Sequence, residues 1–384
     1  MTAHYTIPGY VVGPERVERV YYTLADKFIS DNDNFYVPRL IKYMITPEEA
    51  ELCCQFPATE EELVAALGWA PETVHSLLRD CIKVGLAHLN RKNGKIAFAQ
   101  SIVNIADFGA IDPELIRTRF GTEFLDLLKG IRTSPEYFED YAAFLESKKT
   151  VDENGVVHKR TPLFRILPRY DAIKNIPGVM PCENLMDILD EQEYISTARC
   201  MCRTVGRHGD LAYEGSGAPE EGHCVKFGDA ARYFVEEMGL GRYLTKNELL
   251  ANLNAVKDTP LYHMIGNSRI VKGGFCNCCD DCCDMKMLAK HLPDFRDGLL
   301  PSRFAANADT DACIGCGHCA SLCQFGAIGL GSGTASVDPE ACMGCGVCVV
   351  NCPSEALSLS IVRPPSFIPE DGPQHIQDSL DFLE

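Results

Sequence analysis

A run of four cysteines occurs twice near the C-terminus of this chain, and the two runs share one internal spacing. The pattern C-x2-C-x2-C-x3-C begins at Cys313 and again at Cys342. The flanking residues repeat at the same offset: Asp309 corresponds to Asp338, Gly315 to Gly344 and Ala327 to Ala356. The sequence therefore predicts two related half-units, each with a cysteine loop, a short helix and a short strand, the strands at 327–330 and 356–361.

The chain has 384 residues, of which 20 are cysteines, and the cysteines become denser toward the C-terminus. A chain of this length can bury a full hydrophobic core unaided, so core stability does not explain them. The N-terminus lacks a basic start followed by an apolar stretch, and no secretory signal is predicted. We expect a cytoplasmic protein with reduced thiols, for which metal binding is the simplest use.

The net charge excludes one broad class of partner. At pH 7 the formal charge is −18, which makes the chain a poor general binder of nucleic acids or anionic membranes. No apolar stretch is long enough to span a bilayer.

The spacing within each cysteine run indicates the kind of metal. Thiolates at i, i+3 and i+6 on a tight loop can reach three irons of one cubane cluster, while the fourth cysteine follows after a further turn. Glycines inside the loops are expected to let the backbone approach the sulfides: Gly315, Gly317, Gly344 and Gly346. Four-cysteine zinc sites, the alternative, usually have two separated C-x2-C pairs.

Residues 306–361 resemble the bacterial two-[4Fe–4S] ferredoxin domain. The resemblance implies that the last cysteine of each run ligates the other cluster. Cluster 1 would have Cys313, Cys316, Cys319 and Cys352, and cluster 2 would have Cys342, Cys345, Cys348 and Cys323. Pro353 after Cys352 is usual for the family, whereas Gln324 replaces the proline that is common after Cys323. The resemblance also implies one-electron transfer at low potential.

The middle of the chain has further cysteines that could hold one or two more clusters: Cys200, Cys202, Cys224, Cys276, Cys278, Cys279, Cys282 and Cys283. Among them, 276, 279 and 282 have the spacing of the ferredoxin loops, with a fourth ligand from 200, 202 or 224. Cys278 and Cys283 could then serve another cluster. Structural zinc and redox-active thiols are the alternatives. This series looks like the cysteine-rich region of anaerobic iron–sulfur electron-transfer proteins.

Charged residues and histidines near these cysteines lead to further expectations. Arg203 is expected to donate to sulfur and raise a cluster's potential, and Asp280 and Asp281 to lower it. The glycine-rich segment 205–223 is predicted to be a long loop. His208 and His223 are interpreted as solvated loop histidines rather than ligands.

The N-terminal part has the signals of three helices and a hairpin. The helices are predicted at 46–56, 59–68 and 71–84, and the strands at 86–89 and 95–99 flank an Asn-Gly turn. Residues 37–105 resemble the winged helix-turn-helix family. Acidic and basic residues nearly balance there, so docking or structure is favoured over DNA reading. Cys53, Cys54, Cys81 and Cys182 are expected to be packing thiols.

The sequence thus predicts an α+β protein with a winged-helix-like domain (1–106), a cysteine-rich domain (107–305), a ferredoxin domain (306–361) and an acidic tail (362–384). The expected function is electron transfer through several [4Fe–4S] clusters, as a subunit or dedicated donor of an anaerobic oxidoreductase, with redox proteins as partners. A stand-alone catalyst is less favoured. Two alternatives remain: a reductase with an open-site middle cluster, and a redox-sensing DNA-binding regulator.

Overall fold

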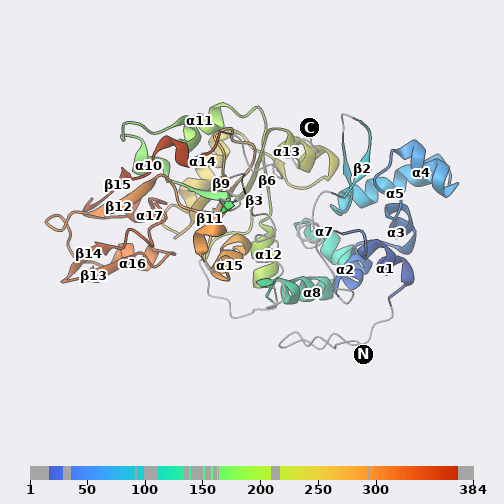
Figure 1. Cartoon of the computed structure of the whole chain (residues 1–384), viewed down its shortest axis with the longest axis horizontal. Coiled ribbons are helices and arrows are strands. Elements are labelled where there is room, and N and C mark those ends of the chain that lie inside the picture. Colours follow the sequence, from blue (N-terminus) through green and yellow to red (C-terminus); the bar gives the residue numbers. More distant parts are fainter. Residues whose placement is uncertain are drawn as a thin grey trace.

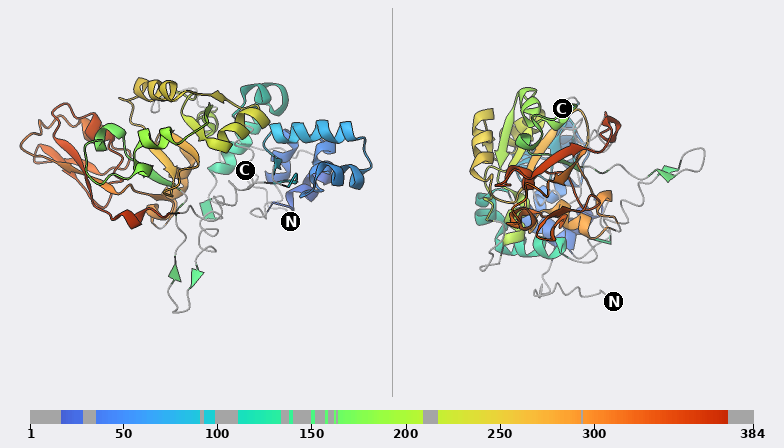
Figure 2. Two further views of the ribbon diagram at one scale, coloured as in Figure 1. Left: turned by 90° about the horizontal axis from the view of Figure 1, so that it is seen from above. Right: turned by 90° about the vertical axis from the view of Figure 1, so that its left-hand side faces the viewer.

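A computed structural model describes residues 17–28, 36–90, 93–98, 111–133, 138–139, 150–151, 157–158, 162, 164–208, 217–292 and 294–370. A helical N-terminal part, a central sheet and a small C-terminal unit follow one another along the long axis of the molecule (Figure 1). The left view in Figure 2 shows the same order. None of the helices in these ranges is long and apolar enough to cross a membrane.

The N-terminal part consists of short helices and one hairpin: α1 (Arg19–Ala25), α2 (Tyr36–Met44), α3 (Pro47–Cys53), α4 (Glu60–Leu67), α5 (Pro71–Lys83), β1 (His88–Leu89) and β2 (Ile96–Ala97). Thr46 and Thr59 each begin a helix with a capping box, and Gly68 ends α4 in the left-handed conformation. The predicted helices and hairpin are present, although the strands are shorter than expected. Ala58 also bridges to Ile96, which adds a third extended segment to the hairpin.

The core of this part continues past residue 106. Three further segments follow: α7 (Pro113–Leu115), a π-helical turn (Ile116–Phe120) and α8 (Thr122–Arg132). Phe124 and Leu128 of α8 lie in one apolar cluster with Leu40 and Leu78, and Val205 of the middle region joins it. Helix α8 therefore connects the N-terminal core to the cysteine-rich region.

A seven-stranded sheet forms the middle region, in the order β11-β5-β9-β10-β7-β6-β8. Its strands are β5 (Phe164–Leu167), β6 (Ile195–Ala198), β7 (Cys224–Phe227), β8 (Arg242–Tyr243), β9 (Tyr262–Gly266), β10 (Gly273–Cys278) and β11 (Leu299–Leu300). Neighbours are antiparallel except β11 and β5. Outside it, β3 (Thr150–Val151) and β4 (Val157–His158) pair antiparallel.

Helices cover both faces of the sheet: α10 (Tyr170–Ile173), α11 (Leu185–Asp190), α12 (Met201–Arg207), α13 (Gly228–Arg232), α14 (Lys246–Ala255) and α15 (Asp284–Lys290). Phe275 and Ile265 pack against Leu189 of α11 and Leu249 of α14 on one face. Because successive side chains of a strand alternate, the cysteines of β10 lie on the other face. Residues Pro181–Glu183 form a 3-10 turn directly before helix α11.

The C-terminal unit reproduces the sequence repeat as a structural repeat. It contains β12 (Phe304–Ala308), α16 (His318–Leu322), β13 (Ile328–Gly331), β14 (Thr334–Val337), α17 (Val347–Val350) and β15 (Leu357–Ile361). Strands β12 and β15 pair antiparallel, and so do β14 and β13. Beyond this unit, buried Ile368 packs on the middle region, and its carbonyl accepts a hydrogen bond from Arg269. Residues 371–384 of the predicted acidic tail lie outside the described residues.

Candidate metal centres

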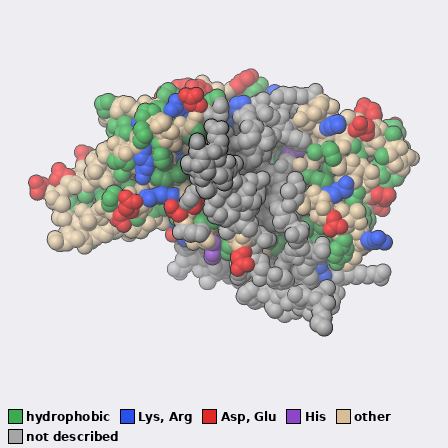
Figure 3. Space-filling model, in the orientation of Figure 1, with side chains coloured by type: hydrophobic (Ala, Val, Ile, Leu, Met, Phe, Trp, Pro, Cys, Tyr) green, Lys and Arg blue, Asp and Glu red, His purple; other side chains and the backbone are tan. Residues whose placement is uncertain are grey.

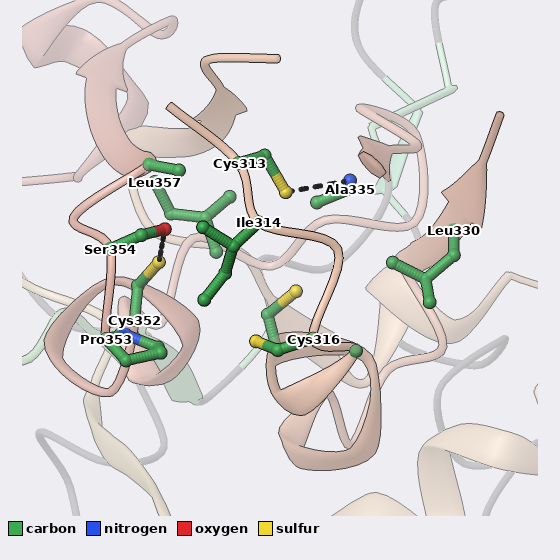
Figure 4. Close-up of a pocket in the computed structure, with 12 residues that line it drawn as sticks. Cys313, Ile314, Cys316, Leu330, Ala335, Cys352, Pro353, Ser354 and Leu357 are labelled. Atoms are coloured by element: carbon green, nitrogen blue, oxygen red, sulfur yellow. Dashed lines mark hydrogen bonds between the residues drawn. The ribbon is translucent and has the colours of Figure 1, made fainter. Parts of the chain in front are cut away.

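Four cysteines line a pocket at the outer end of the C-terminal unit. Three of them, Cys313, Cys316 and Cys319, come from the first loop, and Cys352 comes from the second half (Figure 4). This is the crossed grouping that the family resemblance implies for cluster 1. The side chain of Ile314 beside them is 67% exposed, and Cys316 is exposed as well. The pocket is therefore open toward solvent.

The second group of four thiols is more deeply placed. Cys345 and Cys348 lie close enough to Cys323 and Cys342 for their charges to interact. Burial raises the pKa of the Cys345 thiol to about 11. Thiols in such surroundings lose their protons when a metal ion supplies the compensating positive charge. The four cysteines assigned to cluster 2 are thus brought together, again with one from the other half.

Backbone amides donate to the sulfurs at equivalent positions of the two halves. The N–H of Ala335 donates to Sγ of Cys313 (3.3 Å), and that of Ala306 to Sγ of Cys342 (3.4 Å). Burial raises the pKa of the Cys352 thiol, but hydrogen bonds centred on Ser354 lower it below its ordinary value. Donors aimed at sulfur stabilise negative charge on a cluster and its thiolates. Both four-thiol groups therefore fit a [4Fe–4S] cluster.

Two of the loop glycines are required by the protein backbone itself. A Cβ on Gly315 would lie 2.2 Å from the carbonyl oxygen of Gly333, and one on Gly344 2.1 Å from that of Phe304. Both glycines have φ near +66°. Each is needed because its loop crosses a neighbouring backbone segment in the left-handed conformation, and the expected approach to sulfide stays a prediction.

Four of the middle cysteines are linked on the sheet. Cys224 and Cys276 are direct cross-strand partners on β7 and β10. Hydrogen bonds from Cys224 and Cys278 lower the pKa of the Cys276 thiol well below its ordinary value. Cys278 in turn contacts Cys283. We call Cys224, Cys276, Cys278 and Cys283 the sheet set.

The other four middle cysteines gather beside helix α12. Sγ of Cys279 lies 3.1 Å from Sγ of Cys282. Cys282 interacts electrostatically with Cys200, and a hydrogen bond with Cys200 raises the pKa of Cys202 well above its ordinary value. We call Cys200, Cys202, Cys279 and Cys282 the turn set, because the last two belong to the turn between β10 and α15.

The predicted grouping of Cys276 with Cys279 and Cys282 is not found in these contacts. That prediction assumed a loop, in which residues at i, i+3 and i+6 converge. Residues 273–278 instead form strand β10, where residues at i and i+2 share a face. Cys276 is therefore placed with Cys278, and Cys279 and Cys282 contact each other across the following turn.

Arg203 has the contact with sulfur that the sequence predicts. This side chain is 1% exposed, and its Nε donates to Sγ of Cys279 (3.4 Å). Its other nitrogens donate to the carbonyl oxygens of Pro219 and Asn277. Asp281 lies beside the turn set, with an oxygen within 4.8 Å of the thiols of Cys279 and Cys282. Asp280 instead pairs with Lys286 and Lys290.

The prediction of solvated loop histidines was wrong. His208 follows helix α12 and pairs with Asp126 at 2.9 Å. His223 is buried, and Nδ1 of its ring lies 3.2 Å from the amide nitrogen of Asn277. Burial lowers the pKa of His223 to about 4. Residues 205–207 of the predicted loop belong to helix α12, and residues 209–216 lie outside the described residues. Glycine content carried no information about the sheet that covers His223.

His263 on β9 was missed by sequence reasoning. It is buried, and neither ring nitrogen has a hydrogen-bond partner among the described residues. Burial lowers its pKa well below the ordinary value. A single histidine in a short apolar segment gave no signal of this position.

The remaining cysteines are packing residues, as expected. Cys53 and Cys81 are fully buried in the N-terminal core, with their sulfurs 3.6 Å apart. Cys182 is also buried, and its carbonyl accepts a hydrogen bond from buried Arg165. Cys54, at the end of α3, is only partly buried.

The C-terminal unit and the middle cysteines share one apolar cluster. Met343 and Cys345 of the second loop pack with Tyr262 of β9 and with Cys283 of the sheet set. Cys276 and Cys278 lie at the edge of the same cluster. The backbone N–H of Arg169 also donates to the carbonyl of Cys345 (2.9 Å). The second four-thiol group thus adjoins the sheet set through packed protein.

Comparison with known proteins identifies the C-terminal unit. The family model for the 4Fe-4S dicluster domain matches residues 312–356. No curated protein and no solved structure matches the chain. The protein therefore contains a 4Fe-4S dicluster domain, which implies two [4Fe–4S] clusters and is consistent with iron–sulfur electron transfer.

Proposed function

We propose that this chain is an iron–sulfur electron-transfer protein, a cytoplasmic subunit or dedicated donor of an anaerobic oxidoreductase. It would pass single low-potential electrons through several [4Fe–4S] clusters. The observation that carries the proposal is the shared packing of Cys345 and Met343 with the sheet set. A dicluster domain by itself could act as a mobile electron carrier. In this chain, however, the inner thiols of the domain pack against a second group of cysteines.

The proposed cluster ligands come from the two halves of the dicluster domain and from the middle region. Cys313, Cys316, Cys319 and Cys352 would hold cluster 1, and Cys342, Cys345, Cys348 and Cys323 would hold cluster 2. The sheet set and the turn set would supply one or two further clusters. The protein's own contribution is to exclude water from the inner sites and to aim backbone amides at sulfur.

Electrons would be exchanged with a redox partner at the cluster 1 end. Exposed Ile314 and Leu330 lie at the pocket of cluster 1. Residues 306–361 contain five carboxylates and no lysine or arginine, and acidic side chains are visible at this end in Figure 3. An apolar patch with an acidic surround favours a partner with a basic face.

The N-terminal helices and hairpin are proposed to be a winged helix used for docking within this protein. Arg79 of α5, the helix that would read DNA, pairs with Glu237 of the middle region at 2.8 Å. The ring of His88 stacks on Tyr233 of the same region, with centroids 5.3 Å apart. The ion pair with Glu237 occupies Arg79, which is one of the few cations that α5 could offer to a DNA phosphate. Salt-dependent binding to duplex DNA at physiological salt would contradict the docking role.

The proposal is tested by measuring iron, acid-labile sulfide and zinc per chain on anaerobically purified protein. Two cubanes contain about eight irons. We expect more iron than this per chain, with a matching amount of sulfide. About eight irons together with zinc would restrict redox chemistry to the dicluster domain. Iron near zero with stoichiometric zinc would contradict the electron-transfer function altogether.

A further inference from the structure

The contacts among the eight middle cysteines divide them into two groups of four. Within the sheet set, hydrogen bonds link Cys224 with Cys276, Cys276 with Cys278, and Cys278 with Cys283. Between the sets, Cys202 and Cys224 interact electrostatically. The turn set is joined through Cys200, which contacts both Cys202 and Cys282. Four thiols in each group are the number that one cubane requires.

The backbone explains why the two groups are separate. The sheet set belongs to one face of β7 and β10, with Cys283 reaching it from the start of α15. The turn set lies between α12 and the turn that follows β10. Helix α12 approaches this turn so closely that a Cβ on Gly206 would lie 2.7 Å from Cβ of Cys282. A side chain at position 206 would push the two halves of the turn set apart.

Cations lie beside both sets. Lys226 of β7 interacts with Cys224 and Cys276, and Arg132 interacts with Cys202. Arg203 interacts most strongly with Cys200 and Cys279 but also with Cys276 and Cys278, so it is shared between the two sets. A buried cluster with four thiolates carries negative charge, which must be compensated locally. The cations therefore suit anionic centres at both sets, whereas the backbone separates the sets.

We propose that the sheet set and the turn set hold two distinct [4Fe–4S] clusters, and that the sheet-set cluster is the relay between cluster 2 and the turn set. This proposal rests on the electron-transfer function proposed above. The order follows from packing, because Cys276, Cys278 and Cys283 share an apolar cluster with Met343 and Cys345 of the second loop, whereas no turn-set cysteine belongs to it. The turn set instead adjoins α8, where His208 meets Asp126.

The test is a double-mutant iron count with one cysteine removed from each set. Cys276→Ala removes a sheet-set ligand, Cys282→Ala a turn-set ligand, and the double variant removes both. Alanine keeps the Cβ, so the close contact with Gly206 is undisturbed. Cys182→Ala is the matched control, because that thiol is also buried but belongs to neither set.

With two sites, the wild type should contain about 16 irons, each single variant about 12 and the double variant about 8. The Cys182→Ala control should match the wild type. One shared site would give about 12 irons in the wild type and about 8 in each single variant and in the double variant. That result would overturn the division into two sets but leave the electron-transfer function intact. About 8 irons in every protein would contradict the middle clusters themselves.

Zinc on the same samples distinguishes a further outcome. Zinc that disappears only in Cys282→Ala would overturn the turn-set cluster. The relay order is tested by the electron paramagnetic resonance of reduced cluster 2. Its coupling to cluster 1 should remain in every variant, whereas its additional coupling to a middle cluster should be lost in Cys276→Ala and retained in Cys282→Ala. The reverse result would place the turn set, not the sheet set, next to cluster 2.

Discussion

Lys286 reaches from helix α15 to Phe325, with its ammonium 4.6 Å from the ring centroid. The same ammonium donates to the carbonyl of Gln324, the residue that replaces the proline common in the family. Both residues directly follow Cys323, a proposed ligand of cluster 2. A buried cation of the middle region therefore lies at the junction with the dicluster domain.

Lys286→Met should lower the reduction potential of cluster 2, because a positive charge near a cluster favours its reduced, more negative state. Lys290→Met is the control, since Lys290 pairs with the same Asp280 but is half exposed. The measurement is a potentiometric titration followed by electron paramagnetic resonance. Equal shifts of the cluster 2 potential in the two variants would mean that the position of Lys286 has no specific effect on that potential.

Gly344→Ala should prevent assembly of the second loop. The new Cβ would overlap the carbonyl of Phe304, and the residue would be held at φ +66°. The left-handed conformation alone costs about 1–2 kcal/mol. We expect loss of about four irons, one cubane, measured on the purified protein. Gly329→Ala, which has open space around the new Cβ, should keep the wild-type iron content.

Arg203→Lys should destabilise the middle region even though the charge is retained. The guanidinium donates to Cys279, Pro219 and Asn277, and one ammonium cannot replace this planar fork. Each buried acceptor left without a partner costs about 1–3 kcal/mol. Anaerobic denaturant unfolding should reveal the loss. Arg199→Lys, at a partly exposed pair with Glu220, should change stability by less than about 1 kcal/mol.

Acid should weaken the N-terminal core through His88. Burial lowers the pKa of His88 from 6.5 to about 4. Between these values the unfolded chain binds a proton that the folded chain does not. The stability is therefore complete above pH 6.5 and falls toward pH 4, by up to about 3 kcal/mol.

The fluorescence of Trp69, the only tryptophan, reports unfolding of this core. Urea unfolding from pH 7 to pH 4.5 should show a flatter stability curve for His88→Phe, which keeps an aromatic ring against Tyr233. His75→Gln, at an exposed position, should follow the wild type. Parallel curves for His88→Phe and the wild type would show that His88 does not carry the acid sensitivity.

Local patterns were predictable from the sequence. The capping boxes at Thr46 and Thr59 and the structural repeat around Asp309 and Asp338 depend on neighbours within a few residues. The grouping of Cys352 with the first loop came from the family resemblance, and the pocket geometry agrees with it. The contact between Arg203 and a cysteine of the middle region was also anticipated, because both belong to cysteine-rich segments.

Only the tertiary structure decided how the middle cysteines are grouped. The sequence spacing of Cys276, Cys279 and Cys282 does not reveal whether they lie on one loop or across the end of a strand. The pairing of β10 with β7 and β9 decides that Cys276 lies on a strand. The same pairing buries His223 and His263, whose local sequence gave no such indication. The sequence by itself therefore determined the number and type of potential ligands. Long-range strand pairing determined which thiols meet, because a pleated strand turns alternate residues to opposite faces.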